Sequence, residues 1–231
     1  MALRAGKSAP GWRTIGVLGG MGPAATADFM ARLVAAVPAQ RDADHPRVLV
    51  DSNPHVPDRN GALAGGPSPG PALAAMAADL VARGAEVLAM PCNAAHGWAD
   101  DVLAVPGARL VSMVDAALAE AVQLRPRAIG LIAVGATLDA RIYHDRSPVP
   151  VIECDRALVQ PAVDRIKAGD RGRHVRAMLA AEAARLGAAG ASVVIAACTE
   201  VPLVLRPSDV PVAFIDATAA LVKATLAAAA K

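Results

Sequence analysis

Short apolar runs alternate with longer alanine-rich stretches along the chain. The runs are apolar at consecutive positions, which is typical of strands buried on both faces of a parallel sheet. We expect strands at 14–18, 47–50, 86–90, 109–113, 128–134, 149–153, 192–196 and 212–215. We expect helices at 24–37, 72–83, 116–122, 158–167, 173–186 and 217–229. Strands separated in this way by helices predict an α/β protein.

The chain also repeats itself. Residues 84–93 (GAEVLAMPCN) match residues 190–199 (GASVVIAACT) without a gap, and a cysteine follows the predicted strand in both. Segment 15–19 resembles segment 129–133 in the same way. These matches predict two similar halves whose cysteines meet in one cleft, because ligands of open α/β sheets lie beyond the carboxyl ends of the strands. Chance similarity in an alanine-rich chain is the other interpretation.

From this repeat we expect a tail over 1–13, a first α/β domain over 14–113 plus 209–231, and a second over 114–208. Two further segments, VDA at 114–116 and IDA at 215–217, place an aspartate where it could cap a helix in each half. The segment 51–71 contains five prolines and four glycines and is predicted to be a long loop. Loops of that length in compact domains often carry function.

Composition narrows the class of partner. The chain of 231 residues is 55% hydrophobic, so it can bury a core, but only 2% aromatic, which argues against stacking on nucleic-acid bases. Its net charge of +2 and pI of 8.6 indicate no basic patch, so we expect no nucleic-acid partner. Neither a secretory leader nor an apolar run of roughly 18 residues is present, so we expect a cytoplasmic protein without membrane contact.

The three cysteines are the first candidates for chemistry. They cannot all pair and form no C-x-x-C motif, so a disulfide framework and a zinc ribbon are not expected. Cys92 and Cys198 each stand between a buried strand and a polar segment, where the positive end of a helix would lower a thiol pKa. A single such cysteine is more often a core residue, but the repeated position favours function. Cys154 has no counterpart, and we interpret it as a core residue.

The glycine-rich turn after the first strand allows two interpretations. Residues 20–25 satisfy G-x-G-x-x-A, a dinucleotide fingerprint, with Asp51 as the acid it would require. An anion-binding turn for a carboxylate is the favoured interpretation. No histidines stand at metal-ligand spacing, and His96 could either orient the Cys92 segment or serve the structure alone.

Four segments together resemble the aspartate/glutamate racemase superfamily, and its cofactor-independent aspartate racemase branch most of all. They are 15–23 (IGVLGGMGP), 57–59 (PDR), 91–96 (PCNAAH) and 198–200 (CTE). The resemblance implies two pseudo-symmetric α/β domains with the active site between them, a small amino-acid substrate, no cofactor or metal, and a homodimer. It implies Cys92 and Cys198 as the acid/base pair. The substrate contacts that it implies are Met21, Gly22, Arg59, Asn93, Ala94, Thr137, Lys167, Thr199 and Glu200.

Within that set, Arg59 and Lys167 match the cations that hold a distal carboxylate in aspartate-specific members of the superfamily. Two departures leave the substrate open: Ala94 stands where the superfamily usually has threonine, and Ala136-Thr137 where it has Gly-Thr. Three functions are therefore compared. The first is an aspartate racemase that uses two thiols. The second is a sister enzyme, such as a broad-specificity, glutamate or hydantoin racemase or a maleate isomerase. The third is a non-catalytic ligand-binding homologue.

Overall fold

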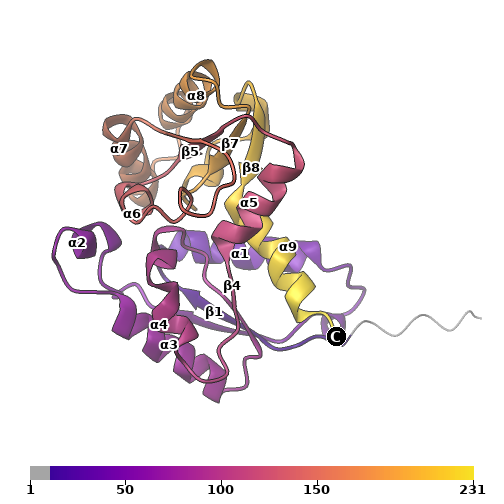
Figure 1. Ribbon diagram of the computed structural model, residues 1–231. Coiled ribbons are helices and arrows are strands. Elements are labelled where there is room, and N and C mark those ends of the chain that lie inside the picture. The colour runs from indigo at the N-terminus through magenta and orange to yellow at the C-terminus, as the bar shows by residue number, and fades with distance from the viewer. Residues whose placement is uncertain (1–10) are drawn as a thin grey trace, which may run out of the picture.

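The computed structural model describes residues 11–231, and residues 1–10 of the expected tail lie outside the described part. Two parallel four-stranded sheets form two halves, with strand orders β2-β1-β3-β4 and β6-β5-β7-β8. The strands are β1 Ile15–Gly19, β2 Val48–Ser52, β3 Val87–Ala89, β4 Leu110–Val111, β5 Ile129–Ile132, β6 Val151–Glu153, β7 Val193–Ala196 and β8 Ala213–Asp216. The predicted fold, two similar parallel-sheet α/β halves, is confirmed (Figure 1).

Helices cover both sheets. They are α1 Pro23–Ala36, α2 Arg59–Leu63, α3 Gly70–Ala82, α4 Ala99–Leu103, α5 Met113–Gln123, α6 Gly135–Asp139, α7 Arg156–Lys167, α8 Arg173–Ala188 and α9 Ala217–Ala229. The central strands of each half are fully buried, as their unbroken apolar sequences predict. No helix within residues 11–231 combines the length and the apolar character that crossing a membrane would require.

The repeat in the sequence has a packing reason. A methyl group added at Gly16 in β1 would lie 2.7 Å from the Leu88 side chain, and one at Gly130 in β5 would lie 3.0 Å from the Leu186 side chain. Both glycines therefore let neighbouring side chains lie directly on the backbone of the central strand. Two halves with the same strand order keep a glycine at the same place for the same steric reason.

The predicted cap pair is only half right. Asp216 does cap α9, because its Oδ1 accepts the N–H of Thr218 at 2.8 Å. Asp115, however, lies in the first turn of α5, and the cap of that helix is Ser112, whose Oγ accepts the N–H of Asp115 at 3.1 Å. Asp115 therefore lies about one helical turn past the cap position that Asp216 occupies in α9. The reason is that α5 begins earlier than its alanine-rich segment suggests.

The expected domain boundary at 209 is wrong for one strand. β8 pairs with β7 and so belongs to the second sheet, although the prediction grouped it with the first domain. Two helices, α5 and α9, each follow a strand of one half and pack against the other half. α5 follows β4 but contacts β7 and β8, whereas α9 follows β8 but contacts β3, β4 and α1. The two crossing helices pack against each other between the halves (Figure 1).

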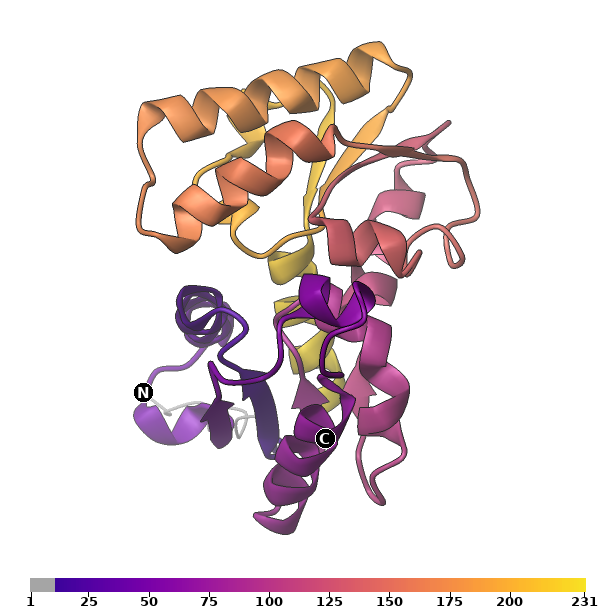
Figure 2. The ribbon, with the colours of Figure 1, turned by 90° about the vertical axis from the view of Figure 1, so that its left-hand side faces the viewer.

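The proline-rich segment 51–71 is not a loop throughout, because it contains α2. Asp58 caps this short helix, with its Oδ2 accepting the N–H of Gly61 at 2.6 Å. α2 contacts α6 of the second half, and Figures 1 and 2 both show it against that half. A segment of the first half thus reaches across to the second near the ends of the strands.

Candidate active site

One pocket lies between the halves, at the carboxyl ends of the central strands. Met21 follows β1, Cys92 follows β3, Val134 follows β5 and Cys198 follows β7. Its lining is Met21, Asp58, Arg59, Asn60, Cys92, Asn93, Ala94, Val134, Ala136, Thr137, Lys167, Cys198, Thr199 and Glu200. The empty space measures about 360 Å³ including the part open to solvent. Every predicted site residue lines this pocket except Gly22, which lines the wider groove beside it.

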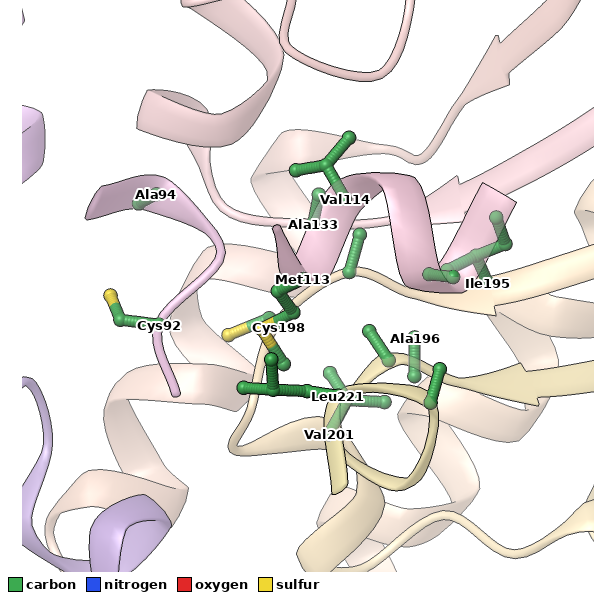
Figure 3. Packing of buried hydrophobic residues seen from close by; sticks show 14 of the residues in the cluster. Cys92, Ala94, Met113, Val114, Ala133, Ile195, Ala196, Cys198, Val201 and Leu221 are labelled. Atoms are coloured by element: carbon green, nitrogen blue, oxygen red, sulfur yellow. The ribbon is translucent and has the colours of Figure 1, made fainter. Parts of the chain in front are cut away.

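The two thiols enter this pocket from different halves, and each cysteine is only 5% exposed. Figure 3 shows them on separate segments of the chain. Burial raises the pKa of both thiols, because a thiolate loses its solvation there. The expectation that a helix end lowers these thiol pKa values is wrong. Only the short 3₁₀ turns Ala94–Trp98 and Val201–Leu203 follow the cysteines, and desolvation outweighs their effect.

A carboxylate touches only one of the thiols. The Cys198 Sγ donates to Glu200 Oε2 at 3.2 Å, and the Thr199 hydroxyl donates to the same oxygen at 3.2 Å. The negative charge of Glu200 raises the pKa of Cys198 beyond the effect of burial. Ala94 takes the matching place two residues after Cys92, where the nearby Arg59 guanidinium instead moderates the rise in the thiol pKa. The two thiols therefore occupy matching positions, but the charged group that acts most strongly on each is different.

Three buried donors on the pocket wall have no partner within the described chain. They are Asn93 Nδ2, Thr137 Oγ1 and Arg59 Nε. Asn93 and Thr137 are 2% and 0% exposed, so water does not readily compensate them. An unpaired buried donor costs about 1–3 kcal/mol. A ligand with acceptor oxygens, such as a carboxylate, would remove that cost.

Two cations line the pocket, one from each half. Arg59 already donates to three carbonyls, Val56 at 3.4 Å and Pro57 at 3.2 Å through Nη1 and Met21 at 3.3 Å through Nη2. Its guanidinium therefore ties α2 to the turn after β1, and Nε is the guanidinium nitrogen that is buried without a partner within residues 11–231. Lys167, at the end of α7, forms no salt bridge with any carboxylate within residues 11–231.

A sequence model of the family described as Asp/Glu/Hydantoin racemase matches residues 18–225. The chain belongs to this family. A broad-specificity amino-acid racemase, RacX, of Bacillus subtilis is 24% identical over 92% of the chain and 96% of the relative. The aspartate racemase of Picrophilus torridus superposes with a TM-score of 0.84 at 24% identity, covering 94% of each chain. Glutamate racemase of Francisella tularensis superposes with a TM-score of 0.60 at 16% identity, covering 91% of this chain and 78% of that one.

Family membership makes the protein a racemase, an isomerase that acts on small amino-acid substrates. Four other residues of the racemase pocket were not among the expected substrate contacts, Asp58, Asn60, Val134 and Ala136. Asn60 Oδ1 accepts the N–H of Ala136 at 2.7 Å, which supplies from the first half the cap that α6 lacks in its own sequence. A signal was available for two of them, because Asp58 and Asn60 flank Arg59 in the segment already suspected of function.

His96 and Cys154 lie outside the pocket wall of the racemase. The Nε2 atom of His96 accepts the N–H of Met113 at 3.0 Å, so its Nδ1–H donates to the carbonyl of Cys92 at 2.9 Å. Burial lowers the pKa of this ring to about 4, so it is neutral. Cys154 is a core residue, as predicted, with its thiol donating to the Ala133 carbonyl at 3.2 Å. Within residues 11–231 no group of three His, Cys, Asp or Glu side chains could hold a metal ion.

Proposed function

We propose that this racemase interconverts L- and D-aspartate without a cofactor, by proton transfer between the substrate and two thiols, Cys92 and Cys198. The observation that carries the proposal is that one pocket is lined by a buried thiol from each half. One thiolate takes the α-proton, and the thiol on the other wall gives its proton to the opposite face of the carbanion. The reverse reaction exchanges the two roles, so atoms and charge balance in both directions.

The unpaired donors support a carboxylate in the pocket. Asn93 Nδ2 and Thr137 Oγ1 are available to the α-carboxylate, which gains negative charge as the α-proton leaves, and Arg59 Nε is available to the distal carboxylate. Donors that are already in place stabilise such developing charge more effectively than water, because they need not reorient during the reaction. This stabilisation matters here because the α-proton of an amino acid is only weakly acidic.

The charges of the lining support aspartate as the substrate. Arg59 and Lys167 supply two cations, and Asp58 and Glu200 supply two carboxylates. Aspartate brings two carboxylates and one ammonium group, so each of its charges can meet an opposite one. Burying the second carboxylate without a cation would cost several kcal/mol. Ala94 removes a hydroxyl from the wall but leaves this pairing intact.

A broad-specificity amino-acid racemase is the second candidate, and the groove beside the pocket favours it. That groove shares Met21, Asp58, Arg59, Lys167 and Glu200 with the pocket. Its lining also includes the apolar residues Pro23, Pro54, Val56, Pro57, Ile166 and Leu203. A side chain longer than that of aspartate could extend into it.

The homodimer stays a prediction from the resemblance.

Exchange of the α-proton in deuterated water tests these proposals. Each enantiomer of aspartate, glutamate, alanine, methionine and lysine would be incubated with the enzyme, with the α-proton followed by NMR and the enantiomers by chiral chromatography. We expect loss of the α-proton signal and racemisation to be fastest for aspartate. Faster reaction of methionine or lysine would favour the broad-specificity enzyme. Binding of amino acids without any exchange would identify a non-catalytic homologue and overturn the proposal.

A further inference from the structure

Tyr143 lies behind the pocket wall rather than on it. It is fully buried in the turns after α6, in the second half, and does not line the pocket. Its hydroxyl donates to Asn93 Oδ1 at 2.6 Å, and Asn93 belongs to the first half. The other end of the same amide, Nδ2, is one of the three buried donors on the pocket wall that have no partner within residues 11–231. One hydrogen bond between the halves therefore sets the direction of a polar group inside the pocket.

The direction of this amide follows from the chemistry of the two groups. A phenol hydroxyl carries one hydrogen, and burial raises the pKa of Tyr143 far above its ordinary value, so the group stays a donor. Giving that hydrogen to Oδ1 leaves both Nδ2 hydrogens for the pocket. The reversed amide would leave the hydroxyl hydrogen of Tyr143 unpaired and would turn Oδ1 toward the ligand. An oxygen in that place would repel a carboxylate, whereas the NH₂ group binds one.

We propose that Tyr143 is a positioning residue that keeps the NH₂ group of Asn93 directed at the substrate carboxylate beside Cys92. Because the two residues come from different halves, this donor is correctly set only while the halves are in contact. The proposal rests on the proposed function for the identity of the ligand, but the direction of the amide is a property of the free protein.

The direct test needs no ligand. In ¹⁵N-labelled protein, the side-chain NH₂ signals of Asn93 are identified by their absence from Asn93→Ala. We expect Tyr143→Phe to shift or broaden these signals, because the amide then samples both directions. Thr225→Val is the control for loss of a buried hydroxyl, since Thr225 is fully buried in α9, outside the pocket, and has no hydrogen-bond partner within the described chain. It should leave the Asn93 signals unchanged. Unchanged Asn93 signals in Tyr143→Phe would overturn the proposal.

A mutant cycle adds a functional readout that general destabilisation would not give. We expect Tyr143→Phe to lower kcat/KM for aspartate by on the order of tenfold, and the double variant with Asn93→Ala to equal Asn93→Ala alone. Independent, multiplying losses would mean that Tyr143 supports the fold rather than Asn93, and would also overturn the proposal. If the wild type exchanges no α-proton, the proposed function fails. The NMR comparison still decides the role of Tyr143 in that case.

Discussion

The two cysteines occupy matching places in two sheets of the same strand order, yet a different charge acts most strongly on each thiol. Near Cys92 the charge that matters most is the guanidinium of Arg59, which moderates the rise in the thiol pKa. Cys198 contacts the carboxylate of Glu200, which adds to that rise. Duplication of the fold thus supplies a thiol on each side of the pocket, and the substituents two residues further on make them unequal. From these directions we expect Cys92 to lose its proton more readily than Cys198.

The supports behind the two thiols differ as well. The carbonyl of Cys92 accepts from the ring of His96, which in turn accepts from the backbone at the start of α5. The carbonyl of Cys198 instead accepts the backbone N–H of Val201 at 3.1 Å. The carbonyl of Cys92 is therefore held by a side chain that can titrate, whereas the carbonyl of Cys198 is held by a backbone N–H. The predictions below test this inequality in charge and in support.

Removal of either thiol should have the largest effect. We expect Cys92→Ala and Cys198→Ala each to lower racemisation of aspartate by on the order of a thousandfold, because each removes the only acid or base on one face of the substrate. Racemisation would be followed by polarimetry from each enantiomer. A single variant that retains a tenth of wild-type racemisation would show that two thiols are not required. Cys154→Ala is the control, and we expect its activity to stay close to wild type.

The two cations should also prove unequal. We expect Arg59→Ala to lower kcat/KM for aspartate by on the order of a hundredfold and Lys167→Ala by on the order of tenfold. The larger loss has a structural reason, since Arg59 also binds the carbonyls of Met21 and Pro57 and so holds α2 against the first half. Activity toward alanine should fall less in both variants. Equal losses for the two amino acids in Arg59→Ala would show that its role is to hold the backbone and not to bind the distal carboxylate.

The pH dependence should be governed by the pair of thiols. The free enzyme needs one thiolate and one thiol, so kcat/KM should give a bell-shaped profile. Burial disfavours the thiolate and raises both pKa values, so the rising limb should lie above about pH 8.5, the ordinary thiol value. Glu200→Gln removes the charge that holds the proton on Cys198. The falling limb should then move to lower pH, and further than the rising limb does. Equal movement of both limbs would contradict the assignment of Glu200 to Cys198.

Local pattern was sufficient to predict much of this molecule. Each half has a glycine in its central strand, Gly16 or Gly130, and a cysteine after the strand that follows Gly-Ala. These features identify the two halves because close packing and strand ends each require particular residues within a segment of about ten. The local sequence does not show which sheet β8 joins, because the pairing of this edge strand depends on where the crossing helices place it. The thiol pKa values were misjudged because desolvation depends on the whole wall of the pocket. Tyr143 and Asn60 were missed as partners because their bonds join positions far apart in the chain.

The smallest effect on catalysis is expected from His96, which supports Cys92 without lining the pocket. Its pKa is lowered to about 4 in the folded chain, against about 6.5 when unfolded. The neutral ring therefore stabilises the fold above pH 6.5, and this contribution is lost as the pH falls through 4. The loss amounts to about 3 kcal/mol between pH 7 and pH 4. Urea unfolding at both values should show this loss in the wild type and in His174→Gln, where an exposed histidine is replaced. His96→Gln should lack it, while its racemisation at neutral pH should change by only a few-fold. A His96→Gln variant with the full acid dependence of the wild type would mean that another group causes it and that both cysteine turns are supported alike.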